Sequence, residues 1–229
     1  ALIAPVIVFT NFMLIAAILL YPGGLMNTTI YIMSLAIAGL ILGGINLPVA
    51  VLIHEFIMEY RYLCVVWITS VNAVLCGINY TILMLSVDRY IAVMSPLVYR
   101  NFMTLENTGA AVNLIWLGVI MLSTLPIMRW STLLLYQRDK HCYHYFILAP
   151  NFVYWTTVVT MPMCLGLALV LYVLTFVRLA RDDKRQAQSR RTSMYSADAS
   201  ALFLQRVSSV KMAFSFTVVY IVLWLPYFV

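Results

Sequence analysis

The stretch that decides the fold is residues 62–93, YLCVVWITSVNAVLCGINYTILMLSVDRYIAV. Residues 62–87 contain no Asp, Glu, Lys or Arg. A helix rises about 1.5 Å per residue, so this run is long enough to cross an apolar bilayer core of about 30 Å. Asp88 and Arg89 follow it directly. Charges at a membrane boundary are costly unless they are paired or functional, so this pair marks a candidate site as well as the end of a helix.

The rest of the chain repeats this composition. It is 64% hydrophobic and only 10% charged, with a mean hydropathy of +0.95, whereas a soluble domain carries about 25% charged residues. The apolar runs are continuous and do not alternate, which indicates helices and not barrel strands. We therefore predict one all-α, multi-pass transmembrane bundle over residues 1–229, with a flexible third cytoplasmic loop at 179–204 and helices at about 1–21, 30–53, 62–92, 107–128, 149–178 and 205–229. Because the chain begins and ends inside apolar runs, we expect it to be part of a longer protein.

The Lys and Arg residues set the expected topology, because positive charge concentrates in cytoplasmic loops. With the N-terminus outside, ten of the 14 basic residues fall in inner loops and four in outer loops. Cys64 and Cys142 then both lie on the outer side, where a disulfide can persist. Free thiols are the alternative. The positively charged chain does not indicate nucleic-acid binding, because its basic residues are separated by membrane spans.

Several motifs stand in a fixed order along these spans. They are Asn11, Ser34–Ala38, Cys64, Ser86–Val93 containing Asp88-Arg89-Tyr90, Pro96-Leu97, Trp116, Pro162 and Trp224-Leu225-Pro226. In this register the whole chain resembles helices 1 to 6 of the rhodopsin-like G-protein-coupled receptors, and Asp88–Pro96 is similar to invertebrate neuropeptide receptors. The resemblance implies a seventh helix beyond residue 229, a plasma-membrane location and no enzymatic activity or cofactor.

The resemblance also implies roles for individual residues. Asp88 holds Arg89 at rest, and Arg89 is released toward a G protein when the sixth helix moves outward. Asp88, Arg89, Tyr90, Pro96, Leu97 and Arg206 form the expected coupling switch. Both Pro162 and Pro226 are expected to distort their helices, because proline removes a backbone donor. The expected activation core comprises Asn11, Gly39, Ile78, Asn79, Pro162, Tyr220, Trp224 and Pro226.

The chain departs from the family pattern in its core. Gly39 replaces an aspartate and Ile78 a serine that together hold sodium in the family, so we predict no sodium site and an agonist affinity insensitive to sodium. Asn79 lies seven residues after Asn72 and shares a helix face with it, which predicts a polar seam between helices.

Two further departures concern the switch. Arg206 replaces a glutamate and would repel Arg89, which predicts a weak resting lock and raised basal signalling. Val170 replaces a tyrosine of the fifth helix. Tyr172 lies about 200° further round that helix, so we do not expect it to substitute.

The expected ligand site is apolar and aromatic. Its candidate residues are Val71, Asn72, Leu75, Trp155, Tyr227 and Phe228. Amine receptors carry a helix 3 carboxylate where this chain has Val71, so a biogenic amine is disfavoured. Mixed charge in the outer loops favours a short peptide. A lipid or nucleoside ligand, or a relative that does not signal, is the alternative.

Other expected partners lie in the membrane and on its inner side. They are membrane lipid, a heterotrimeric G protein, and an arrestin and kinase at the third inner loop. There Arg190-Arg191-Thr192-Ser193 is a basic kinase pattern, and a phosphate on Ser193 would reverse local charge. No metal site is expected. A transporter or channel is disfavoured, because the predicted spans contain no acidic or basic residue near the membrane centre.

Overall fold

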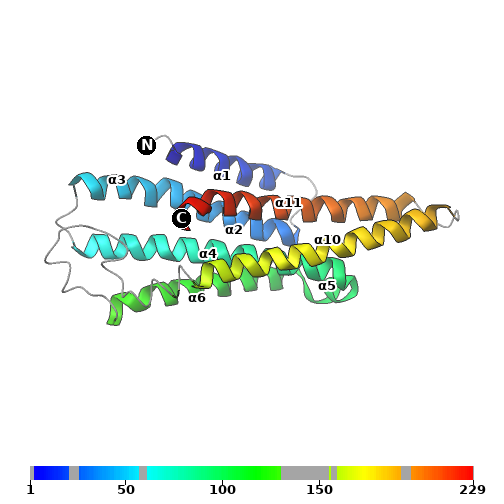
Figure 1. The fold of residues 1–229 in the computed structure, drawn as a ribbon. Coiled ribbons are helices and arrows are strands. Elements are labelled where there is room, and N and C mark those ends of the chain that lie inside the picture. Colours follow the sequence, from blue (N-terminus) through cyan, green and yellow to red (C-terminus); the bar gives the residue numbers. More distant parts are fainter. Residues whose placement is uncertain are drawn as a thin grey trace. The chain divides into compact units, whose positions relative to one another are not determined.

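The structure is a computed structural model, shown as a ribbon in Figure 1. It describes the backbone of residues 3–20, 26–56, 61–129, 155, 159–191 and 197–228. Within these ranges it describes the side chains of residues 3–20, 26–51, 65–125, 155, 159–185 and 203–222. All regular structure in these ranges is helical, which confirms the predicted all-α fold class.

The helices follow the predicted spans closely. Five of those described are long and apolar enough to cross a membrane: Ile3–Leu20, Asn27–Val51, Val65–Met94, Leu105–Leu125 and Met161–Arg185. The elements are α1 (Ile3–Leu20), α2 (Asn27–Ile41), η1 (Leu42–Asn46), α3 (Leu47–Phe56), α4 (Arg61–Met94), α5 (Pro96–Phe102), α6 (Leu105–Arg129), α10 (Met161–Arg191) and α11 (Ala197–Phe228). The sixth predicted span lies in the C-terminal part of α11.

The chain divides into two compact units, and each is described by itself. The first contains residues 1–81 and 105–163 and the second residues 82–104 and 164–229. In the first unit α2 packs against both α1 and α6. Its close approach to α1 depends on two glycines four residues apart. A Cβ on Gly39 would lie 2.6 Å from Asn11 Nδ2, and a Cβ on Gly43 would lie 2.8 Å from Ile7 Cγ2. Small residues at this spacing allow membrane helices to approach closely.

A π-helical segment, η1, interrupts the second span. The amide of Leu47 donates to the carbonyl of Leu42, five residues earlier. Pro48 follows immediately. Pro48 has no N–H to donate to the carbonyl of Gly44, and its ring would clash with that carbonyl in a regular α-helix. The wider turn accommodates this proline, and π-helical turns of this kind are frequent at functional sites.

A tryptophan joins three helices of the first unit. The indole Nε1 of Trp116 on α6 donates to Ser34 Oγ on α2 over 2.8 Å. Its six-membered ring lies over Gly77 of α4, so closely that a Cβ there would be 2.5 Å from Cζ3. A groove of about 280 Å³ opens beside it, lined by residues of α2 and α6 that include Met33, Val112 and Trp116 itself.

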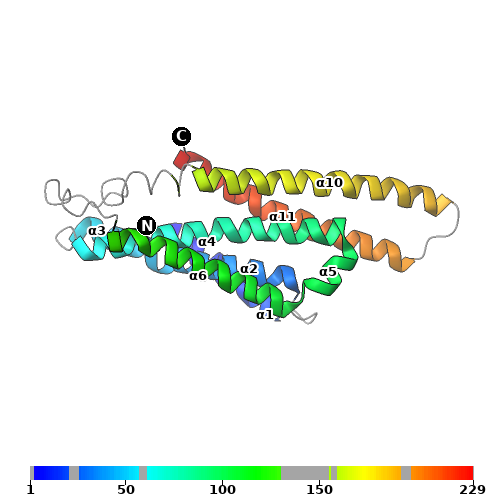
Figure 2. The same ribbon diagram turned by 90° about the horizontal axis from the view of Figure 1, so that it is seen from below.

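The second unit contains the end of α4, the short α5, and the paired helices α10 and α11. Figures 1 and 2 show α10 and α11 lying alongside each other in both views. Phe214 of α11 joins them, because its ring makes edge contacts with Tyr172 at 5.4 Å and with Phe176 at 5.3 Å. These aromatic contacts position α11 against α10 close to the end of α4.

Two predicted boundaries need correction. The loop predicted at 179–204 is largely helical, because α10 continues to Arg191 and α11 begins at Ala197. The residues concerned are mostly Arg, Lys, Gln, Ala and Asp, and several of these form helices readily, so polarity here ends the membrane span without ending the helix. The segment between α4 and α6 contains the unpredicted helix α5, which starts with Pro96 in its first turn, where a proline lacks no needed donor.

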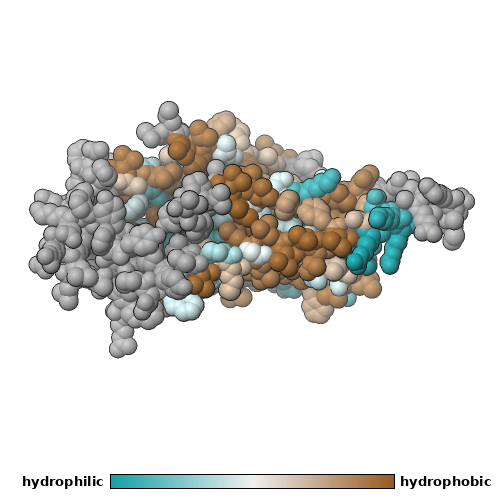
Figure 3. Space-filling view, viewed as in Figure 1, coloured by the Kyte–Doolittle hydropathy of each residue, from teal (hydrophilic) through white to brown (hydrophobic). Residues whose placement is uncertain are grey.

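Apolar side chains cover much of the outer surface. Figure 3 shows a broad brown area over the middle of α10 that gives way to teal at its C-terminal end. Exposed residues here include Leu167, Val170, Leu174 and Val177. An exposed apolar belt of this size is expected where lipid is the solvent.

Candidate functional site

The candidate switch is built around Arg89 near the C-terminal end of α4. Asp88 is fully buried, and Arg89 is 8% exposed. The guanidinium of Arg89 donates to Asp88 Oδ2 through Nε over 2.9 Å and also through Nη2. The Tyr99 hydroxyl of α5 and the Ser209 hydroxyl of α11 accept further hydrogen bonds from it, at 3.0 Å and 2.7 Å. Three separate helices therefore hold one arginine.

The charge balance of this network explains how the arginine is kept in place. Asp88 is the one carboxylate among these partners, and the two hydroxyls are neutral. A buried arginine–carboxylate pair is costly to separate, because either charge alone would be left unsolvated. The hydroxyls add directional acceptors at about 1.5–3 kcal/mol each when the donor is charged. The link from α4 to α11 is thus a hydrogen bond to a neutral acceptor, which can break without separating two opposite charges.

Arg206 lies on α11, as the sequence predicted. Arg206 is exposed, and among the described contacts of Arg89 the α11 partner is Ser209. Ser209 is three residues further on, on the same broad face of the helix. Among the described residues no printed contact joins Arg206 to Arg89, and the predicted repulsion between them stays a prediction. Sequence reasoning missed Ser209 because its residue type gives no charge signal.

Tyr172 corrects a second prediction about the switch. Val170 is 54% exposed, whereas Tyr172 is completely buried. The hydroxyl of Tyr172 lies within interaction range of Thr217 and of the charges on Asp88 and Arg89. The inward face of α10 is defined by its buried stripe, Cys164, Ala168, Tyr172, Thr175 and Leu179. The reason given for excluding Tyr172, that the inward position is that of Val170, is therefore wrong, and a role of Tyr172 in the switch stays a prediction.

Irregular helical backbone lies directly before Pro162, where a distortion was expected. The regular α10 begins at Met161, so Pro162 stands in its first turn, where a missing amide is tolerated. Trp155, Val159 and Thr160 before it have π-helical geometry. The Thr160 hydroxyl donates to the carbonyl of Trp155 over 2.6 Å. The irregular backbone thus precedes the proline and does not interrupt the helix that carries Tyr172.

Asn11 takes up the space beside Gly39. Its amide Nδ2 donates to the carbonyl of Ile7 over 2.8 Å, and its side-chain atoms lie where a Cβ of residue 39 would be. Ile78 is buried on α4. Neither Gly39 nor Ile78 supplies a side-chain oxygen, which is the ligand that a sodium ion requires. The predicted insensitivity to sodium stays a prediction.

The glycine–asparagine contact can be tested by its effect on stability. Gly39→Ala should destabilise the full-length protein by about 1–2 kcal/mol, because the added methyl forces Asn11 to turn and break its bond to Ile7. In an Asn11→Ala background the same change should be neutral or stabilising, because alanine favours helix. Thermal unfolding in detergent measures both.

The control for this pair is Gly118→Ala on α6, where a Cβ would have no neighbour within 4 Å. It should not lower the unfolding midpoint. Equal losses from Gly39→Ala in the wild-type and Asn11→Ala backgrounds would contradict the close contact, since the two sites would then be uncoupled.

The two asparagines share a buried part of α4, and the predicted polar seam between helices stays a prediction. Asn72 and Asn79 are both buried, as is Cys76 between them. Asn79 Nδ2 donates to the carbonyl of Leu75 over 2.9 Å. The thiol of Cys76 approaches Asn72 Oδ1 at 4.0 Å. These local bonds satisfy polar groups that lipid cannot solvate.

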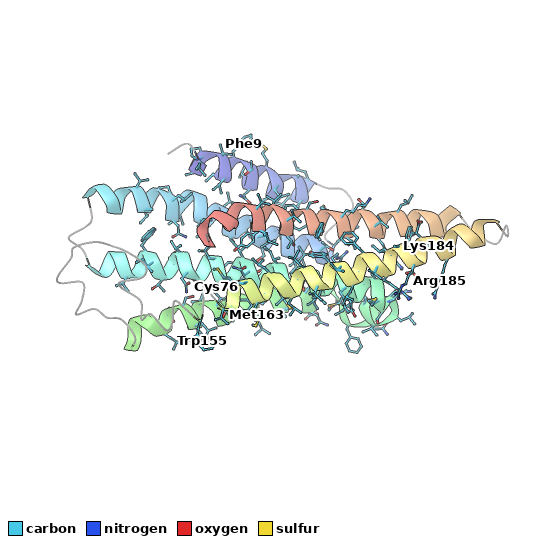
Figure 4. All side chains as sticks on the ribbon, in the orientation of Figure 1. Phe9, Cys76, Trp155, Met163, Lys184 and Arg185 are labelled. Atoms are coloured by element: carbon cyan, nitrogen blue, oxygen red, sulfur yellow. The ribbon has the colours of Figure 1, made fainter. Side chains whose placement is uncertain are left out.

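Three predicted ligand residues also lie on α4. Leu75 and Asn72 are buried and Val71 is partly buried. Trp155 is 61% exposed, and Figure 4 shows it apart from Cys76, so Trp155 does not line an enclosed site in this structure. Tyr227 and Phe228, with Trp224 and Pro226, are described for their backbone in α11 alone. Cys142 and Ser193 lie outside the described residues, as does the Cys64 side chain.

No metal site emerges in the part of the chain that the structure describes, where no three His, Cys, Asp or Glu side chains gather. Apolar spans with a buried, multiply bonded arginine near the end of one of them indicate a multi-pass membrane protein. Comparison with known proteins then specifies its family. The 7 transmembrane receptor (rhodopsin family) pattern matches residues 10–229. The chain belongs to this family.

Several curated proteins resemble it in sequence. The human histamine H2 receptor is 29% identical over 208 residues, covering 88% of this chain and 55% of that receptor. The histamine H1 receptor of Cavia porcellus is 28% identical, covering 70% and 33%. The muscarinic acetylcholine receptor gar-2 of Caenorhabditis elegans is 30% identical, covering 58% and 23%. The chain thus spans about half the length of the histamine H2 receptors that it matches.

Proposed function

We propose that the protein is a plasma-membrane receptor, with its N-terminus outside, that converts extracellular ligand binding into activation of a heterotrimeric G protein. The observation that carries the proposal is the Arg89 network. One buried arginine joins α4, α5 and α11, and its bond to α11 has a neutral acceptor, the hydroxyl of Ser209. Movement of α11 would break that bond and free Arg89, as a bistable switch requires.

The helix α5 provides a surface for the G protein. Tyr99 on one side of α5 accepts a hydrogen bond from Arg89. Leu97 on the other side is 81% exposed, and Phe102 at the end of the helix is also exposed. Since α5 follows the last turn of α4, these apolar side chains belong to the proposed cytoplasmic face. A partner that packs on Leu97 is thereby connected to Arg89 through one short helix.

The ligand that we propose is a short peptide. The relatives are named for histamine and acetylcholine, which makes a small amine the second candidate. An amine needs a carboxylate partner, and no acidic residue occurs between Arg61 and Val87. Val71 stands where amine receptors carry that carboxylate, and it is a partly buried aliphatic side chain. The peptide is favoured because the outer part of α4 offers apolar contacts and one buried amide, Asn72.

The function is tested by expressing the full-length receptor and measuring G-protein activation with a panel of neuropeptides and a panel of amines. We expect activation by a peptide and none by histamine or acetylcholine. The matched control for the amine panel is Val71→Asp, which introduces the carboxylate that amine receptors carry at this position. Activation of the wild type by an amine would overturn the peptide proposal. Expression at the cell surface with no activation by any G protein class would support the non-signalling relative.

Ser209 should govern basal activity. Ser209→Ala removes the α11 acceptor and should raise ligand-independent signalling several-fold, because a hydrogen bond to a charged donor is worth about 1.5–3 kcal/mol. Arg206→Gln should leave basal signalling unchanged, because Arg206 is exposed. Second-messenger levels, corrected for surface expression, measure both. A large drop in basal signalling with Arg206→Gln would instead restore the arginine–arginine repulsion.

Tyr172 should assist the released arginine. Tyr172→Phe removes a buried hydroxyl near Asp88 and Arg89 and should lower the maximal ligand response while the receptor still reaches the surface. Val170→Phe, on the exposed side of the same helix, should have no such effect. Dose–response curves of the two variants measure the maximal response. Equal maximal responses of Tyr172→Phe and Val170→Phe would show that Tyr172 is not part of the switch.

A further inference from the structure

The outward face of α10 carries an unbroken series of exposed side chains. Leu167, Val170, Leu174 and Val177 are exposed apolar residues at alternating spacings of three and four. Arg181 and Lys184 continue this spacing and are also exposed. Because these intervals return to one side of a helix, the apolar stripe leads directly into a basic one. Figure 4 shows Lys184 and Arg185 at the opposite end of α10 from Met163.

The charges at this end of α10 are separated by sign around the helix. At about 100° per residue, Arg181 points about 180° away from the fully buried Tyr172. Lys184 and Arg185 lie within about 60° of Arg181 on either side. The acidic residues point the other way around the helix, with Asp183 about 20° and Asp182 about 80° from the direction of Tyr172, although Asp183 is itself exposed at this end of α10. The side of the helix centred on Arg181 therefore carries bases and no acid over this turn.

Arg178 lies at the border between the basic outward side of α10 and the side that carries the acidic residues. Its Nε lies 3.5 Å from Asp182 Oδ2, so this base is already paired. Arg181, Lys184 and Arg185 are exposed bases that follow directly after the lipid-facing stripe. Long basic side chains at a helix end extend toward the headgroup layer while their stems remain in apolar surroundings.

We propose that Arg181, Lys184 and Arg185 form a binding site for an acidic phospholipid of the cytoplasmic leaflet, whose acyl chains lie along Leu174 and Val177. The inference rests on the proposed topology, which places the C-terminal end of α10 at that leaflet. The occupant is a lipid and not a soluble anion, because the bases are continuous with an exposed apolar face. Charge complementarity sets the headgroup: several phosphates match three cations on one face.

The test uses the full-length protein in detergent with phosphatidylinositol 4,5-bisphosphate and phosphatidylcholine, and native mass spectrometry to count bound lipid. We expect the wild type to retain the bisphosphate lipid preferentially. Arg181→Gln, Lys184→Gln and Arg185→Gln together should reduce that preference at least about tenfold, since each surface base strengthens binding to acidic lipid several-fold. The charge-retaining set Arg181→Lys, Lys184→Arg and Arg185→Lys should restore it.

A second set of three substitutions removes the same amount of positive charge at other positions. Arg100→Gln, Arg206→Gln and Lys211→Gln are exposed positions in the same unit and should leave lipid retention unchanged. Equal loss in both sets would mean a response to net charge alone and would overturn the site. Retention of inositol trisphosphate as tightly as the lipid would also overturn it, as would an unchanged preference in the triple glutamine variant.

Failure of this proposal is separable from failure of the proposed function. Lipid retention is measured without ligand or G protein, so a receptor that does not signal can still bind the lipid. The topology is tested independently by antibody access to an N-terminal tag on intact cells. A tag reached only after permeabilisation would remove the cytoplasmic placement of α10, and with it the lipid site.

Discussion

Gly77→Leu should abolish delivery of the full-length protein to the cell surface. A Cβ at Gly77 would lie 2.5 Å from Cζ3 and 2.6 Å from Cη2 of Trp116, closer than van der Waals contact allows. The indole is rigid and is held by its 2.8 Å hydrogen bond to Ser34. Displacing it would break that bond and separate α2, α4 and α6 at their common contact. Proteins are stable by only about 5–15 kcal/mol, so a disruption at three helices is enough to prevent folding.

The groove beside Trp116 makes the loss of folding depend on the size of the side chain introduced at Gly77. An added methyl can push the ring part of the way into the space of about 280 Å³ that it already lines. Gly77→Ala should therefore cost about 1–3 kcal/mol, the usual range for overpacking, and leave a measurable folded fraction. A leucine needs more room than a small shift of the ring provides.

The matched control for Gly77 is Gly118 on α6. A Cβ there would meet no atom within 4 Å, so Gly118→Leu should reach the cell surface normally. Flow cytometry with an N-terminal tag measures surface delivery, and thermal unfolding in detergent ranks the variants that fold. Normal delivery of Gly77→Leu would show that the three-helix contact is not required.

Arg89→Ala should eliminate ligand-dependent G-protein activation. The change removes the group that the Asp88 carboxylate and the Tyr99 and Ser209 hydroxyls hold together. It also leaves Asp88 fully buried without its cation, which costs several kcal/mol unless the carboxyl takes up a proton. Some loss of surface expression is therefore expected, and activation must be corrected for it.

Two companion variants separate charge from geometry at Arg89. Arg89→Lys keeps the cation but lacks the planar fork that bonds Asp88, Tyr99 and Ser209 together, so we expect a partial response. Arg100→Ala removes an exposed cation of α5 and should leave activation intact. Full activation by Arg89→Ala at matched surface density would refute the proposed switch.

The membrane spans could be predicted from composition, because lipid allows few alternatives. An uncharged run such as 62–87 can satisfy its backbone only as a helix, and the structure has α4 over Arg61–Met94. The ends of the helices were harder to predict than the spans. The residues after Leu179 are polar, and polarity indicates where a helix leaves the membrane but not where it ends, since Arg, Lys and Gln favour helix in water as well.

The candidate site was predictable in part. Asp88 and Arg89 could be placed because charge at a membrane boundary is rare. Their uncharged partners could not, since nothing in the residue types Tyr99 or Ser209 distinguishes them from other surface hydroxyls. Tyr172 was excluded because the family's tyrosine position falls on Val170 in this chain. The burial of α10 shows instead that Tyr172, and not Val170, lies on its inward face.

The π-helical segment η1 has a consequence for how sequences of this family are compared. One additional residue within Leu42–Asn46 is absorbed without a loop, yet it turns everything after it by about 100°. Positions 47–51 therefore face a different direction from the same positions counted along an uninterrupted helix. Deletion of Gly44 would restore regular pitch and bring Val51 around to another side of the helix. An alignment without gaps across Pro48 can match residues that occupy different faces.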